Sequence, residues 1–129
     1  MGYVITIDTS SKRAVVRAEG HNDLETSLAA MDELAARADF LPGYAILCDF
    51  RTNDYTPGTS ESSKLAEAYA SRFGGRPMAV VVSSLLHYGI ANMITTIVRL
   101  RGSPVAAFRE IDEAEAWLRE ATGQSQASR

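Results

Sequence analysis

The chain has 129 residues, of which 46% are hydrophobic and 22% charged, and its formal net charge is −3. This length and composition indicate one globular domain and argue against intrinsic disorder. Lys and Arg are scattered along the chain instead of forming a basic cluster, so we expect no nucleic-acid partner.

Three further features concern the compartment of the protein. The N-terminal residues have neither the charged region nor the apolar region of a signal peptide. The longest apolar run, residues 78–86, is far too short to cross a bilayer. Because Cys48 is the single cysteine, no intrachain disulfide can form. We therefore expect a cytoplasmic protein without membrane insertion.

The N-terminal third predicts a hairpin followed by a helix. Residues 3–8 (YVITID) alternate apolar and polar side chains, and residues 13–20 (RAVVRAEG) follow after a polar turn. Asn22 is a good N-cap with Glu25 three residues later, and the helical spacing after it ends near Asp39.

Three buried strands and two helices are expected to follow. The strands are short apolar runs, and the helices have apolar positions at helical spacing. The first of these helices buries Leu65, Tyr69 and Phe73 and ends at Gly74-Gly75. The predicted strands are residues 44–50 (YAILCDF), 78–82 (MAVVV) and 104–108 (PVAAF). The second helix spans 85–100, with core positions at Leu86, Ile90, Met93, Ile94 and Ile97.

A last helix is predicted at the C-terminal end. Asp112 is its expected cap, with Glu115 as the capping-box partner, and Ala114, Trp117 and Leu118 are its expected buried residues. The element order is then strand-strand-helix-strand-helix-strand-helix-strand-helix. It predicts an α/β fold with a mixed sheet of about five strands. We expect one domain over residues 1–121 and a flexible tail over 122–129.

Several phrases in this order resemble the SpoIIAA-like family of the STAS fold, the fold of anti-sigma-factor antagonists. They are CDFR (48–51), RPMAVVVSSLLHYGIANM (76–93) and VAAFREIDEAEAWL (105–118), and the likeness extends over residues 3–120. The resemblance implies a non-enzymatic module that binds a regulatory protein.

In that family a partner kinase phosphorylates a serine or threonine at the start of the second helix, which here implies Thr59 or Ser60. The family's Asp-Ser pairing is absent, because Asp54 is followed by Tyr55. The hydroxyl of Thr59 or Ser60 could equally cap the helix.

A candidate binding edge follows from the topology. In parallel α/β sheets ligands bind at the carboxyl ends of the strands, and polar side chains gather there in this sequence. The predicted edge for a partner or ligand consists of Asp49, Arg51, Asp54, Tyr55, Ser83, Ser84, His87, Tyr88 and Arg109.

Other functions remain open beside partner binding. A carrier or sensor of a small apolar or anionic ligand would need a cavity between the sheet and the helices, with Tyr55, Tyr69, Tyr88 and Phe108 in its wall. A small hydrolase using Ser83 or Ser84 with His87 is disfavoured, because a nucleophile elbow needs glycines that VVSSLL lacks. One of these serines is expected to cap the next helix, which places His87 in an exposed first turn.

No metal site and no cofactor are expected, because the two histidines and Cys48 have no ligand spacing and no nucleotide-binding glycine motif is present. Cys48 is expected to be an inert buried thiol. The helix over 85–100 has an unusually broad apolar surface, which predicts a homodimer through this helix or an uncovered sheet face.

Overall fold

The chain begins with the predicted antiparallel hairpin, β1 (Gly2–Asp8) and β2 (Arg13–Glu19), in a computed structural model that describes residues 2–123. The turn is held by Asp8, whose Oδ1 accepts hydrogen bonds from the backbone N–H groups of Ser10 (3.0 Å) and Ser11 (3.2 Å). Hydrogen bonds from the side chains of Ser11 and Ser10 favour the carboxylate and lower the pKa of Asp8 to about 2.

The first helix, α1 (Leu24–Ala36), begins one residue later than predicted. Asp23 is its N-cap: its carboxylate accepts from the Thr26 N–H at 2.8 Å, and the Asp23 N–H donates to Thr26 Oγ1 at 2.9 Å. The predicted cap with Asn22 and Glu25 is therefore wrong. Asn22 is only 2% exposed and is used elsewhere, as described below. The helix ends at Ala36 rather than near Asp39, because the next residue has an extended backbone.

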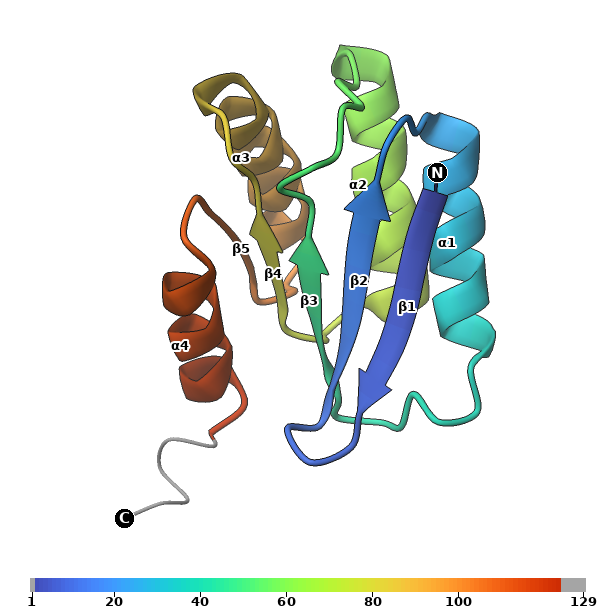
Figure 1. Ribbon diagram of the computed structural model, residues 1–129. Helices are drawn as coiled ribbons and strands as arrows, with labels where there is room; N and C mark the ends of the chain where they lie inside the picture. The colour runs from blue at the N-terminus through green and yellow to red at the C-terminus, as the bar shows by residue number, and fades with distance from the viewer. Residues whose placement is uncertain (1, 124–129) are drawn as a thin grey trace.

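The remaining elements follow in the predicted order. They are β3 (Ala45–Asp49), α2 (Thr59–Phe73), β4 (Met78–Val81), α3 (Leu85–Leu100), β5 (Val105–Phe108) and α4 (Ile111–Ala121). The five strands lie in the sheet in chain order, and only the β1–β2 pair is antiparallel. The fold is therefore α/β with a five-stranded mixed sheet, as expected (Figure 1).

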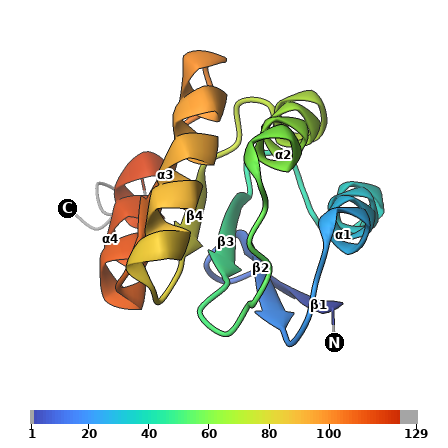
Figure 2. The same ribbon diagram turned by 90° about the horizontal axis from the view of Figure 1, so that it is seen from above.

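This strand order decides where the helices lie. Right-handed crossovers that always step in the same direction place their helices on the same face of the sheet. Accordingly α1, α2 and α3 cover one face, whereas α4, which follows the last strand, covers the other (Figure 2). The main core lies under the three helices, and a smaller core lies under α4 around Leu47, Val81 and Leu118.

Two other predicted caps are wrong. The N-cap of α2 is Gly58, without a side-chain hydrogen bond, so neither Thr59 nor Ser60 caps this helix. The N-cap position of α4 is Glu110, also without a side-chain bond, and Asp112 lies inside the first turn. The predicted buried stripe of α2 is confirmed, and its chain reversal uses Gly75 at φ +87°.

Helix α3 begins and ends at the predicted residues, but two of its expected core residues are exposed. Leu86 is 64% exposed and Met93 is 38% exposed, because the helix turns its Ala91, Thr95 and Val98 face to the core. At the C-terminal end of the described chain, Thr122 caps α4 with its hydroxyl on the Leu118 carbonyl (2.8 Å). Most of the predicted flexible tail, residues 124–129, lies outside the described residues.

The capping box gives a pH-dependent prediction. Replacing Asp23 by Ala removes the cap and is expected to lower the melting temperature by a few degrees at pH 7. Hydrogen bonds from Thr26 lower the pKa of Asp23, so its contribution is present above the ordinary value of 3.8 and is lost as the pH falls further. The difference between wild type and D23A in thermal melts should therefore shrink below that pH.

The matched control is Thr59→Ala, which stands at the start of α2 without a capping bond. A loss of melting temperature in T59A as large as that in D23A would contradict this assignment of the caps.

Candidate functional site

The carboxyl ends of the parallel strands β3, β4 and β5 meet at one edge of the sheet, as predicted. The Phe50 N–H donates to the Val81 carbonyl at 2.9 Å, and the Val82 N–H donates to the Phe108 carbonyl at 3.0 Å. Ser83 Oγ then donates to the Arg51 carbonyl at 2.9 Å, which joins the loop after β3 to the turn after β4. The candidate residues from β3 and β4 are thus brought together.

Two charged residues of this edge, Asp49 and Arg51, are already paired with each other. Arg51 makes a two-pronged contact with Asp49, with both nitrogen–oxygen distances at 2.8 Å. Hydrogen bonding to Arg51 lowers the pKa of Asp49, and the same bond raises the pKa of Arg51. Asp54 lies 3.4 Å from the exposed ring of His21, and Arg109 is exposed. The Arg51 guanidinium is therefore occupied by Asp49 rather than free for an anion.

Residues 50–58, the mouth loop, are fastened at one end by Asn53. Its Oδ1 accepts from the buried Asn22 Nδ2 at 3.1 Å and from the Tyr55 N–H at 3.3 Å. Thr52 Oγ1 adds a bond to the Ala18 carbonyl at 2.9 Å. Sequence reasoning missed Asn22 and Asn53 as a pair, because they lie 31 residues apart and each looks locally like a turn or cap residue.

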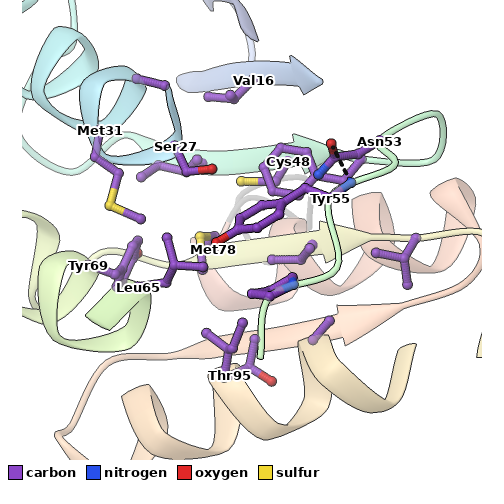
Figure 3. Close-up of a pocket in the computed structure, with 18 of the residues that line it drawn as sticks. Val16, Ser27, Met31, Cys48, Asn53, Tyr55, Leu65, Tyr69, Met78 and Thr95 are labelled. Atoms are coloured by element: carbon purple, nitrogen blue, oxygen red, sulfur yellow. Dashed lines mark hydrogen bonds between the residues drawn. The ribbon is translucent and has the colours of Figure 1, made fainter. Parts of the chain in front are cut away.

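A cavity of about 160 Å³ lies behind the mouth loop, between the sheet and the three helices (Figure 3). Its wall is almost entirely apolar. The strands contribute Val16, Ile46, Cys48, Met78 and Val80 among others, with Val82 directly after β4, and the helices contribute Met31, Leu34, Leu65, Tyr69, Phe73, Ile90, Ala91, Ile94, Thr95 and Val98 among others.

The position of α2 explains this cavity. The backbone of α1 packs along β1 and that of α3 along β5, but α2 packs mainly against its two neighbouring helices rather than against a strand. Side chains must therefore fill the space between α2 and the sheet. Several that face this space, Ser27, Ala30, Ala91 and Thr95, are too small to do so.

Tyr55 lies at the mouth of the cavity, with its ring directed inward (Figure 3). Its hydroxyl donates to Glu61 Oε1 at 2.6 Å, across the first turn of α2. Burial, together with this bond to Glu61, raises the pKa of the Tyr55 phenol, so it stays protonated at neutral pH. The phenol thus holds a fixed position in the entrance.

His87 joins the other end of the mouth loop to α3. Its Nε2 lies 3.1 Å from Thr56 Oγ1, and its Nδ1 lies 3.1 Å from Ser84 Oγ. The expectation of an exposed His87 is therefore wrong: the ring is partly buried and lines the cavity. Thr56 is exposed, so this contact is the more accessible of the two fastenings of the loop.

The Ser84–His87 contact belongs to the N-cap of α3. Ser84 is the N-cap of α3, as one of the two serines was predicted to be, and its Oγ accepts from the His87 N–H at 3.0 Å. A Ser-His pair for acyl transfer needs a third group that orients the base. Here the second ring nitrogen of His87 meets Thr56, while Asp49 is bound to Arg51.

The predicted cavity wall is correct for two of its four residues. Tyr55 and Tyr69 line the cavity. Tyr88 packs against the same core without lining it, and Phe108 lies on the opposite face, where its ring is 5.9 Å from that of Trp117. The error for Phe108 arises because alternate residues of β5 face opposite sides of the sheet.

Thr59 and Ser60 are both exposed in the first turn of α2, so their phosphorylation stays a prediction. Within residues 2–123, no cluster of three or more His, Cys, Asp or Glu side chains could hold a metal ion. Over the same residues, the helices are all too short or too polar to cross a membrane.

No protein-family model and no curated protein matches this sequence. Among solved structures, the chain is similar to the crystal structure of an uncharacterised protein of the DUF3478 family with a SpoIIAA-like fold from Shewanella loihica PV-4. The sequences are 19% identical, the TM-score is 0.59, and the match covers 91% of this chain and 94% of that chain. The likeness confirms the predicted SpoIIAA-like fold.

Cys48 offers a test of the cavity's interior, because its thiol is buried and lines the wall. Burial, with a smaller effect of Asp49, raises its pKa from 9.0 to about 12. At pH 8 the folded protein should therefore hold about 1000-fold less thiolate than the unfolded chain. Iodoacetamide should modify the folded protein correspondingly slowly, and the rate should rise about tenfold per pH unit between pH 7.5 and 9.5.

The reference for this measurement is the same protein in guanidinium chloride, followed by mass spectrometry. Alkylation of the folded protein at the unfolded rate would contradict a buried, protonated Cys48.

Proposed function

We propose that this protein is a non-catalytic regulatory module of the SpoIIAA-like fold, whose input is a small apolar molecule bound in the cavity. The observation that carries the proposal is the cavity itself: about 160 Å³ of space with an apolar wall, placed behind a loop at the ligand-binding edge of an α/β sheet. A protein interior is normally packed without such voids, because each one lowers the stability of the folded state.

The volume indicates the size of the ligand. An engineered apolar cavity of about 150 Å³ in another protein takes up benzene. The space here fits a molecule of comparable or slightly larger size, such as a single aromatic ring or a short branched alkyl chain.

The polar groups of the wall indicate the chemistry of the ligand. Four hydroxyls in the wall already have partners. Tyr3 and Ser27 contact each other at 2.6 Å, Tyr69 donates to the Arg76 carbonyl at 2.8 Å, and Thr95 donates to the Asn92 carbonyl at 3.2 Å. A ligand deep in the cavity therefore needs to offer no hydrogen bonds, which favours an apolar molecule over the anionic one. A polar end would be tolerated only at the mouth, beside Tyr55 and His87.

The mouth loop connects the cavity to the surface on which a regulatory partner would act. Tyr55 and Pro57 line the cavity, whereas Asp54 and Thr56 of the same loop are exposed. A ligand that displaced Tyr55 would move these exposed neighbours and the start of α2, where Thr59 and Ser60 lie. The ligand can shift the equilibrium between the present and the displaced position of the loop only by the difference between its binding free energies for the two.

The test fills the cavity from within. Ala91→Leu adds three carbons from the core-facing side of α3 and is expected to raise the melting temperature while reducing binding of benzene or indole at least tenfold. Isothermal titration calorimetry and thermal melts with each probe measure the two effects. Ala29→Leu on the exposed side of α1 adds the same group outside the cavity and should leave probe binding unchanged.

The proposal fails if neither probe binds the wild-type protein, or if A91L binds them as tightly as wild type. Native mass spectrometry of the purified protein adds an independent readout, since a co-purified small molecule should be present in wild type and lost in A91L.

A further inference from the structure

The outward side of α3 is apolar, although it faces solvent. Within residues 2–123, six large hydrophobic side chains are exposed, and four of them lie on this helix: Leu85 (71%), Leu86 (64%), Met93 (38%) and Leu100 (83%). From residue 85 to residue 98 the helix contains no Asp, Glu, Lys or Arg. Surface helices normally carry charge on the side opposite the core, and depletion of charge is typical of the centre of an interface.

The outward residues form a regular row. Leu86, Gly89, Met93, Thr96 and Leu100, here called the α3 seam, follow one another at spacings of three and four, and all five are exposed. This is the spacing of the contact positions of two packed helices. Large residues occupy the first position of each repeat and small residues, Gly89 and Thr96, occupy the second.

Gly89 has no explanation within the monomer. A Cβ added at this position would meet no atom within 4 Å, and the residue lies inside a regular helix, where glycine is a poor choice. Its absent side chain does, however, leave a depression between Leu86 and Met93 into which a side chain of another molecule fits.

The alternation of large and small residues selects one arrangement of two copies. In an antiparallel helix pair, first positions of one helix face second positions of the other. Met93 then faces Gly89 of the partner subunit, and Leu86 faces Thr96 of the partner subunit, so each large side chain meets a small one. A parallel pair would place Met93 against Met93 of the partner subunit and leave a gap between the two glycines.

We propose that the protein forms a two-fold symmetric homodimer through antiparallel packing of the α3 seam, with Met93 of each copy seated at Gly89 of the other. Such an isologous contact uses the same patch twice and closes without leaving a free face. Leu85 extends the contact at the N-terminal end of α3, and Arg99, whose Nη2 donates to Thr96 Oγ1 at 2.9 Å, borders it at the C-terminal end.

The size of the patch predicts a dimer of moderate affinity. Stable interfaces bury about 800 Å² of each partner. The α3 helix has 16 residues and is about 24 Å long, so its outward side supplies the apolar centre of such an interface but not its whole area. The dimer should therefore dissociate on dilution, which makes it measurable by sedimentation equilibrium between about 1 and about 200 µM protein.

Two substitutions test the surface. Met93→Glu places two carboxylates of like charge in the seam. Because like charges repel each other across an interface, the dimer dissociation constant should rise at least about tenfold. Leu41→Glu is the matched control, because Leu41 is 47% exposed but lies in the loop before β3, and it should leave association unchanged. Circular dichroism and thermal melts check that each variant folds.

A size exchange tests the register. Gly89→Met alone fills the depression that receives Met93 and should also raise the dissociation constant at least tenfold, while a helix former replaces glycine and the monomer keeps its stability. Adding Met93→Ala to the same chain again pairs one large with one small residue at each contact between the two copies. The dimer dissociation constant should then return to within about threefold of the wild-type value.

Several results would overturn the proposal: a wild-type protein that stays monomeric over the whole concentration range, a Met93→Glu variant that associates like Leu41→Glu, a Gly89→Met variant that dimerises as wild type does, or a double variant that does not regain association. None of these measurements involves the cavity ligand, so they stand apart from the proposed function.

Discussion

The order of the strands in the sheet is the constraint on which this structure depends. Each crossover from β2 to β5 steps to the next neighbour in the same direction, and the right-handed rule then places α1, α2 and α3 on one face. Because α1 packs along the edge strand β1 and α3 along the edge strand β5, α2 lies between these two helices. That middle helix, α2, rests on its neighbours rather than on the sheet, and the cavity is the space beneath it.

The mouth loop is held at one end by hydrogen bonds of Asn53 and at the other by the contact between Thr56 and His87. These two ends differ in burial, and the difference decides where the cavity can open. On the Asn53 side, the buried Asn22 amide donates to the partly buried Asn53, and breaking this bond would leave the Asn22 amide without a partner away from water. On the other side a single contact joins the exposed Thr56 to His87. Local opening should therefore begin at residues 56–58 and stop at Asn53, because regions with few buried contacts open first.

The types and order of the elements were predictable from the sequence, because they depend on local periodicity. The stripe of Leu65, Tyr69 and Phe73 is buried as predicted, and α3 begins and ends at the predicted residues. The caps were less predictable. Asn22 and Asp23 are both good N-cap residues, and the choice between them depends on Asn53, which reaches Asn22 only in the folded chain.

The same reason explains the errors in the candidate site. Leu86 and Met93 fit a helical stripe as well as the true core residues do, because α3 is apolar on several sides, and only the sheet decides which side is buried. The position of Tyr55 in a cavity could be expected in outline, but the volume of that cavity depends on how far α2 stands from the sheet. No local pattern encodes this distance.

The void under α2 also affects how the protein responds to hydrostatic pressure. A cavity of about 160 Å³ per molecule corresponds to about 100 mL/mol, and this space is eliminated when the chain unfolds and water reaches its walls. Volume changes on unfolding scale with such voids, so this space adds to the pressure sensitivity of the domain. A molecule that occupied the cavity would remove part of that volume difference, and the folded state would then withstand higher pressure.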